Sequence, residues 1–155
     1  ESDEPVIGID WYPTLLEATE TKPPENYQLD GASLMPLLRN SDTKLDRKAI
    51  YWHFPCYLQG RGDPHGGPFR TTPAAAIRMG DWKLIEWFET GRLELYNLKK
   101  DIGESKNLVE SQPEELKRLY DAMKGWRAKV KAPIPTKPNP KYDPNAIPAQ
   151  EKKRK

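Results

Sequence analysis

The chain has 155 residues, 36% of them hydrophobic, which is enough for one domain with a core of its own. Its 25 basic and 23 acidic residues leave a net charge of +2, and this balance argues against nucleic acid as a partner. No run of about 18 apolar residues is present, so we expect no membrane partner either. The single cysteine, Cys56, has no partner for an internal disulfide.

The first part of the chain predicts two short helices. One covers Ile9 to Thr19, with Asp10 as its capping residue and Pro13 in its first turn, where the missing N–H costs little. After a loop, Asp30 and Gly31 predict a turn, and a brief helix follows from Ser33. Both helices are short and need partners to be stable.

An aromatic segment and a long loop come next. Residues Ala49 to Phe54 are aromatic and partly β-branched, which predicts a buried strand. From Pro55 to Pro73 the chain is rich in glycine and proline. A loop of this length in a compact domain usually binds something or is disordered, so this segment is the first candidate for a functional region.

Three strand-like runs then follow each other closely: Ala74 to Met79, Trp82 to Phe88 and Leu93 to Tyr96. The short polar turns between them are typical of an antiparallel meander, with Ala49 to Phe54 as a fourth strand. The middle run carries apolar bulk on both faces, which indicates that a helix covers at least one of them. Glu86 interrupts one apolar face, and we expect it to pair with a basic residue rather than to act as an acid; the candidates are Arg78 and the neighbours of Lys83 across the sheet.

A long helix is predicted from Ser111, as the capping residue, to about Lys131. Apolar residues recur along it at helical spacing and form one stripe: Leu116, Leu119, Tyr120, Met123, Trp126 and Val130. Pro133 ends the helix, and residues 133–155 form a proline-rich, basic tail that we expect to lie along the surface or to stay mobile, without further secondary structure. The predicted fold class is α+β, a small antiparallel four-stranded sheet packed by a long C-terminal helix and preceded by shorter helices.

Five segments in a fixed order carry a family resemblance: IDWYPTLLE, LDGASLMPLL, YWHFP, AAIRMGDWKLIEWFETGRLELYNL and DIGESKNL. Together they resemble the carboxy-terminal part of arylsulfatase-type sulfatases of the alkaline phosphatase superfamily. The resemblance implies three regions: residues 1–48 as the end of the catalytic α/β domain, 49–132 as a C-terminal subdomain of sheet and helix, and 133–155 as a mobile tail.

The resemblance also implies a function. Sulfatases hydrolyse sulfate esters, here of a sulfated carbohydrate or an aryl sulfate, with a formylglycine nucleophile made from a C-x-P-x-R motif and with a calcium ion. Cys56 is followed by Tyr-Leu-Gln-Gly and does not fit that motif. The carboxylates of Asp10, Asp30 and Asp101 are explained as caps and turns rather than as calcium ligands. We therefore expect no catalytic residue and no metal site in this chain, which would be inactive without an upstream catalytic domain; the parent would be periplasmic or secreted.

Four residues in and before the long loop are the predicted substrate-binding set: His53, Tyr57, His65 and Arg70. In sulfatases resembling this chain, the corresponding loop lies at the mouth of the active site. A guanidinium such as that of Arg70 suits a sulfate or carboxylate, although solvation alone also explains His65 and Arg70. His53 equally fits a core histidine bonded to a backbone carbonyl.

Two alternatives stay open at this level. Phosphodiesterases and phosphonate hydrolases share the superfamily, and only the nucleophile would separate them from sulfatases. A non-catalytic module that binds glycans or a partner protein is the alternative from another class. A piece separated from its parent would expose an apolar patch, for which the sequence offers Leu15, Leu16, Leu34 and Leu37.

Overall fold

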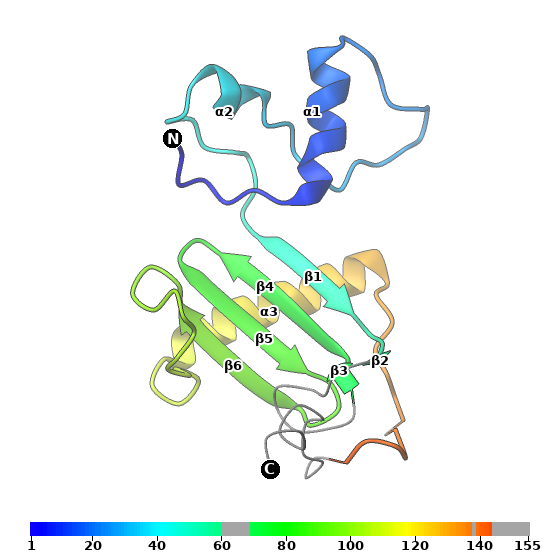
Figure 1. Ribbon diagram of the computed structural model, residues 1–155, viewed down its shortest axis with the longest axis vertical. Helices are drawn as coiled ribbons and strands as arrows, with labels where there is room; N and C mark the ends of the chain where they lie inside the picture. Colours follow the sequence, from blue (N-terminus) through cyan, green and yellow to red (C-terminus); the bar gives the residue numbers. More distant parts are fainter. Residues whose placement is uncertain (60–68, 138, 144–155) are drawn as a thin grey trace, which may run out of the picture. The chain divides into compact units, whose positions relative to one another are not determined.

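The computed structural model describes residues 1–59, 69–137 and 139–143, in two compact units, Glu1–Ile50 and Tyr51–Lys155 (Figure 1). Each unit is described by itself. The predicted boundaries after residues 48 and 132 stay predictions.

The first unit contains a 3-10 turn, η1 (Gly8–Asp10), followed directly by α1 (Trp11–Ala18) and then by α2 (Met35–Arg39). Both predicted helices are confirmed. The expectation that the side chain of Asp10 caps α1 is wrong, because it makes no capping bond to that helix. It accepts instead from the backbone N–H groups of Ile7 and Ala32 and binds Arg47. The patch expected in this unit is only partly exposed, since Leu15 is 58% exposed and Leu34 only 8%.

The second unit is built on a four-stranded antiparallel sheet in the order β1-β4-β5-β6. The strands are β1 (Ile50–Phe54), β4 (Ala74–Met79), β5 (Trp82–Trp87) and β6 (Arg92–Asn97), close to the predicted runs. Gly80 and Gly91 lie in the two hairpin turns with φ of +58° and +67°, a conformation that glycine adopts without strain.

One face of the sheet is covered by α3 (Pro113–Val130), as the apolar stripe predicts (Figure 1). The centre of the core is fully buried and joins three strands to the helix through Ile77, Leu84, Leu95, Leu119 and Met123. The helix begins one residue later than predicted, because Gln112 holds the capping position and the hydroxyl of Ser111 donates to the carbonyl of Leu108.

The long glycine- and proline-rich segment contains structure that the sequence did not indicate. β2 (Leu58–Gln59) and β3 (Phe69–Thr71) pair antiparallel as a two-stranded ribbon. Strands of two and three residues are too short to show an alternating pattern, so the sequence predicts a loop throughout the segment.

The fold class itself, α+β with the sheet packed by the C-terminal helix, is confirmed. Within the described ranges, no helix combines the length and apolarity needed to cross a bilayer.

Candidate functional site

His53 lies on β1 and turns toward the α3 side of the sheet. Its Nε2–H donates to the carbonyl oxygen of Pro133 at 2.7 Å, because a carbonyl can only accept. Its ring lies 5.6 Å from Phe88 and 6.2 Å from Trp126 between ring centres. The bond to a backbone carbonyl matches the core-histidine alternative, while Nδ1 is buried and has no hydrogen-bond partner among the described residues.

Tyr57 lies between β1 and the ribbon. Its hydroxyl donates to Oε2 of Glu89, and its ring packs against Phe69 at 4.7 Å between ring centres. Burial and the neighbouring Glu89 carboxylate both raise the pKa of the Tyr57 phenol, so the group stays protonated and acts as a donor. Glu89, in the turn after β5, is a residue that sequence reasoning did not single out.

Arg70 lies on β3, where its side chain is exposed. It is available to an anion approaching the ribbon. His65 lies outside the described residues. Cys56 is exposed, between β1 and β2, and carries a free thiol.

The described structure therefore places three predicted residues at one end of the sheet without joining them. No hydrogen bond or ring contact links His53, Tyr57 and Arg70 to each other within the described part of the chain. His53 and Tyr57 are each hydrogen-bonded to another segment, and Arg70 is exposed to solvent. The arrangement offers two hydrogen-bonding side chains and a guanidinium, which are groups for binding, and it shows no nucleophile paired with a base.

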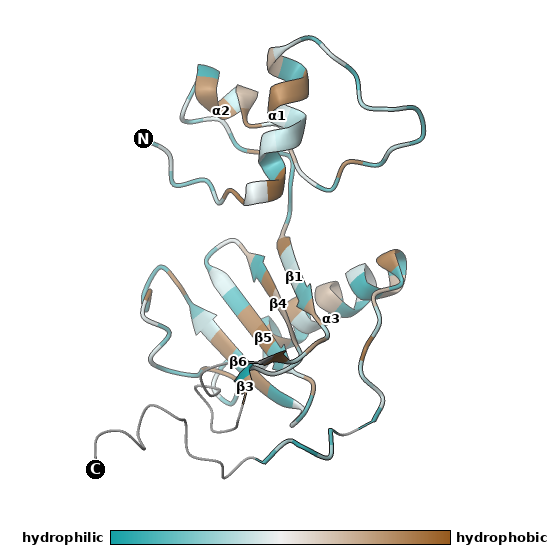
Figure 2. Ribbon diagram, turned by 45° about the vertical axis from the view of Figure 1, so that its right-hand side comes forward, coloured by the Kyte–Doolittle hydropathy of each residue, from teal (hydrophilic) through white to brown (hydrophobic). Residues whose placement is uncertain are grey.

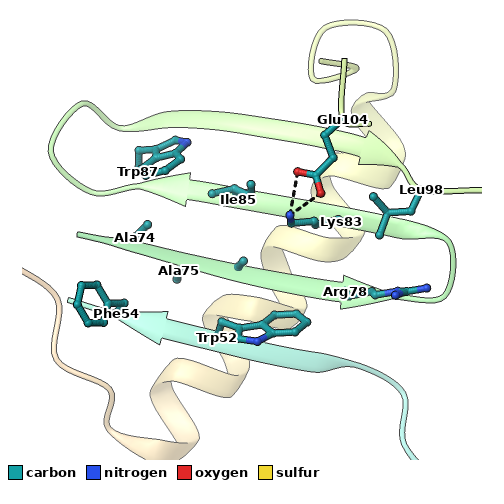
Figure 3. Close-up of a pocket in the computed structure, with 11 residues that line it drawn as sticks. Trp52, Phe54, Ala74, Ala75, Arg78, Lys83, Ile85, Trp87, Leu98 and Glu104 are labelled. Carbon is teal, nitrogen blue, oxygen red and sulfur yellow. Dashed lines mark hydrogen bonds and ion pairs between the residues drawn. The ribbon is translucent and has the colours of Figure 1, made fainter. Parts of the chain in front are cut away.

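The face of the sheet opposite α3 carries a hollow of about 490 Å³ (Figure 3). We name this surface the open sheet face. Its lining is mainly apolar, with Trp52 and Phe54 from β1, Ala74 and Ala76 from β4, and Ile85 and Trp87 from β5. Trp52 is 42% exposed and Phe54 44%, so the predicted buried strand is buried on one side only. Figure 2 shows how hydrophobic segments recur along the sheet strands.

Charged residues lie at one end of the open sheet face. The ammonium of Lys83 binds both carboxylate oxygens of Glu104, at 2.6 and 2.8 Å, and so ties the loop after β6 to β5 (Figure 3). Arg78 lies on the same side and donates through Nε to the carbonyl of Gly80, at 3.4 Å. Glu86 pairs with a basic residue, as expected, but the suggested partners in the sheet are wrong, because the partner comes from the helix.

That partner is Arg127 of α3, whose Nη1 lies 2.6 Å from Oε2 of Glu86. The hydroxyl of Tyr120 donates to the other oxygen at 3.0 Å. Arg127 is 6% exposed and lies four residues after Met123, within the apolar stripe. This spacing was the available signal that a basic residue of the helix faces the sheet.

The described residues bring no three His, Cys, Asp or Glu side chains together in a group that could hold a metal ion. Asp101 is used locally, since it accepts from the backbone N–H groups of Ser105 and Lys106.

Comparisons with known proteins agree with this architecture. Residues 1–130 match the family described as N-sulphoglucosamine sulphohydrolase, C-terminal. A sulfatase of Formosa agariphila is 32% identical over 139 residues, which cover 83% of this chain and 24% of that protein. The chain spans about a quarter of the length of the curated relatives it matches.

Solved structures show the same similarity. BT4656, solved in complex with its substrate D-glucosamine-2-N,6-O-disulfate, is 26% identical with a TM-score of 0.60, over 79% of this chain and 24% of that one. BT1596, a 2-O GAG sulfatase, is 25% identical with a TM-score of 0.64, over 84% of this chain and 27% of that one. The order of the five sequence segments, the sheet packed by α3 and these matches lead to one conclusion: the chain belongs to the sulfatase family, as a member of its N-sulphoglucosamine sulphohydrolase C-terminal group.

Proposed function

We propose that this chain is the C-terminal portion of a sulfatase that hydrolyses sulfate esters of a carbohydrate. The family match over residues 1–130 is the observation that carries the proposal. The carbohydrate is supported by BT4656, which was solved with its substrate D-glucosamine-2-N,6-O-disulfate, and by BT1596, a 2-O GAG sulfatase. An aryl sulfate is the second substrate class that the family allows.

In this proposal, the chemistry belongs to polypeptide outside this chain. Relatives are about four times as long as the region they share with it. The formylglycine nucleophile and the calcium ion would lie in that further polypeptide, since Cys56 lacks the C-x-P-x-R context and the described carboxylates do not form a calcium site. The chain would be inactive by itself.

The contribution of this chain is recognition and support. Arg70 offers an exposed guanidinium on β3, and a guanidinium binds sulfate or carboxylate oxygens through two parallel hydrogen bonds. His53, Tyr57 and His65 complete the proposed substrate-binding set. The open sheet face would pack against polypeptide outside this chain, because a large apolar patch is rarely left uncovered.

The first test is to read the coding DNA upstream of Glu1 for an in-frame C-x-P-x-R motif. If it is present, the full-length protein should release sulfate from sulfated sugars, and the isolated chain should not. A start codon close to Glu1 with no such motif upstream would remove sulfate hydrolysis from this protein and leave a binding module.

The second test concerns recognition. In the full-length enzyme, Arg70→Ala should raise KM for a sulfated sugar about tenfold with little change in kcat, since one charge-assisted hydrogen bond to the substrate is lost. Arg39→Ala is the matched control, because Arg39 is an exposed arginine paired with Glu17. Equal KM values for both variants would show that Arg70 does not contact the substrate.

A further inference from the structure

The segment that follows α3 is hydrogen-bonded to the rest of the second unit at two points. We name residues 133–137 and 139–143 the strap. At one end, the carbonyl of Pro133 accepts from His53, as described above. Further along, the backbone N–H of Asn139 donates to Oε1 of Glu89 at 3.1 Å. Figure 1 shows the strap leaving α3 and passing the β2–β3 end of the sheet.

The second point of attachment is shaped by a local turn. The N–H of Tyr142 donates to the carbonyl of Asn139 at 3.0 Å, and the N–H of Lys141 donates to the Asn139 side chain at 3.0 Å. Asparagine followed by proline, here Asn139 and Pro140, is a favoured start for such a turn. The carbonyl of Asn139 is thus used within the turn, its side chain serves both Lys141 and Tyr57, and its N–H donates to Glu89.

Glu89 connects this turn to the ribbon. One carboxylate oxygen accepts from Asn139 and the other from the hydroxyl of Tyr57. Tyr57 packs on Phe69, which is 8% exposed and begins β3, the strand that carries Arg70. A single half-buried carboxylate therefore joins segments that are 32 and 50 residues away from it in sequence.

We propose that Glu89 and the strap position the substrate-recognition residues His53 and Tyr57. Both residues are bonded to the strap, His53 directly and Tyr57 through Glu89 and through the side chain of Asn139. Glu89 acts through Tyr57 and does not contact the substrate itself. The recognition role rests on the proposed function, whereas the positioning is a property of the chain alone.

The test uses the whole chain and compares Glu89→Ala with Glu104→Ala. The second variant also loses a half-buried glutamate, but that glutamate pairs with Lys83 and does not contact the strap residues described above. Loss of a charge-assisted hydrogen bond should raise the rate of tryptic cleavage after Lys141 about tenfold in Glu89→Ala and leave it unchanged in Glu104→Ala. The pKa of Tyr57, followed by NMR of its ring, should fall in Glu89→Ala only, while burial, the larger cause of the raised pKa, remains in both variants. Equal cleavage and equal titration in the two variants would overturn the proposal.

Conservative variants guard against general unfolding. Tyr57→Phe keeps the ring against Phe69 and removes only the hydroxyl, and His53→Phe keeps a ring beside Trp126 and removes only the donor to Pro133. His53→Phe should loosen the strap, and Glu89→Gln, which retains an acceptor oxygen, should loosen it less than Glu89→Ala. Unchanged cleavage in His53→Phe would show that the strap is not held at that end.

The link to recognition is measured in the full-length enzyme. Glu89→Ala should raise KM for a sulfated sugar severalfold with kcat nearly unchanged, and Glu104→Ala should not. A looser strap with an unchanged KM would make Glu89 merely structural and overturn its positioning role. If the full-length protein hydrolysed no sulfate ester, the proposed function would fall, while the cleavage and titration results would still decide the attachment of the strap.

Discussion

Buried polar residues hold the first unit together through contacts between distant segments. Asp10 is 0% exposed, and its carboxylate accepts hydrogen bonds from the N–H groups of Ile7 and Ala32 and from the guanidinium of Arg47. Burial raises the pKa of Asp10, but the hydrogen bonds from Arg47, Ala32 and Ile7 outweigh it, so the pKa lies below its usual value. The ionised form of Asp10 is therefore stabilised by folding.

We expect Asp10→Asn to lower the free energy of unfolding of the first unit by about 2 kcal/mol, since the charge-assisted bond to the partly buried Arg47 is lost. Glu17→Gln, which weakens the exposed pair with Arg39, should cost less than about 1 kcal/mol. Hydrogen exchange of the α1 amides measures both. Equal protection in the two variants would mean that Asp10 does not connect these segments.

The lowered pKa of Asp10 also sets the direction of a pH effect. A carboxyl group whose pKa is lower in the folded state contributes stability that is present above the unfolded pKa, about 4. That contribution is lost as the pH falls through the folded value. The difference between Asp10→Asn and the unchanged chain should therefore be full at pH 6 and shrink below pH 4. A difference that is constant across this range would contradict the assignment.

The role of a residue was predictable where it depends on its neighbours in sequence, and it was not predictable where it depends on a distant segment. The turn role of Asp101 follows from its neighbours in sequence, and its bonds to Ser105 and Lys106 agree with it. The partner of Glu86 comes from α3, 41 residues away, and the partner of Tyr57 comes from the turn after β5, 32 residues away. No local pattern selects such partners.

At the scale of elements, a close approach of backbones explains one glycine of the first unit. A Cβ atom added at Gly31 would lie 2.2 Å from the carbonyl oxygen of Ile9, which is backbone in η1 and cannot move aside cheaply. The sequence assigned Gly31 to a turn, but its φ is not in the left-handed range. Because Gly31 has no side chain, its loop can pack closely against the backbone of η1.

Gly31→Ala should therefore destabilise the first unit by about 2 kcal/mol or more, as overpacking does. Gly8→Ala is the matched control, because an added Cβ there meets nothing within 4 Å, and it should change stability by less than about 1 kcal/mol. Urea unfolding followed by hydrogen exchange in η1 and α1 measures the two. Similar stabilities would show that the loop shifts to accommodate the methyl group.

Strands and helices with a clear hydrophobic period were predicted close to their observed ends. The hairpins β4–β5 and β5–β6 and the helix α3 depend on alternation, turn residues and a 3.6-residue stripe, all of which are local. The β2–β3 ribbon has too few residues to show a hydrophobic period. Its contact with the turn after β5, through Tyr57 and Glu89, is visible only in the tertiary structure.

At the scale of the whole molecule, the open sheet face is an apolar surface of the second unit that α3 does not cover. Trp52→Lys on this face should reduce the binding of an apolar dye by the isolated chain and leave its melting temperature nearly unchanged, because Trp52 is 42% exposed. Val130→Lys on α3, at 47% exposure, is the control and should change neither quantity. Equal dye binding by all three proteins would argue against an uncovered binding face.

The sequence by itself determined the α+β class, the four long strands, the two N-terminal helices, α3 and the resemblance to sulfatases. These depend on short-range periods and on motif order along the chain. Only the tertiary structure decided which face of the sheet is covered, which residue neutralises Glu86, and that Glu89 connects Tyr57 to the strap. The physical reason is that a side chain is paired or buried by segments brought to it in space, and the alternation of a strand does not say which of its two apolar faces a helix will cover.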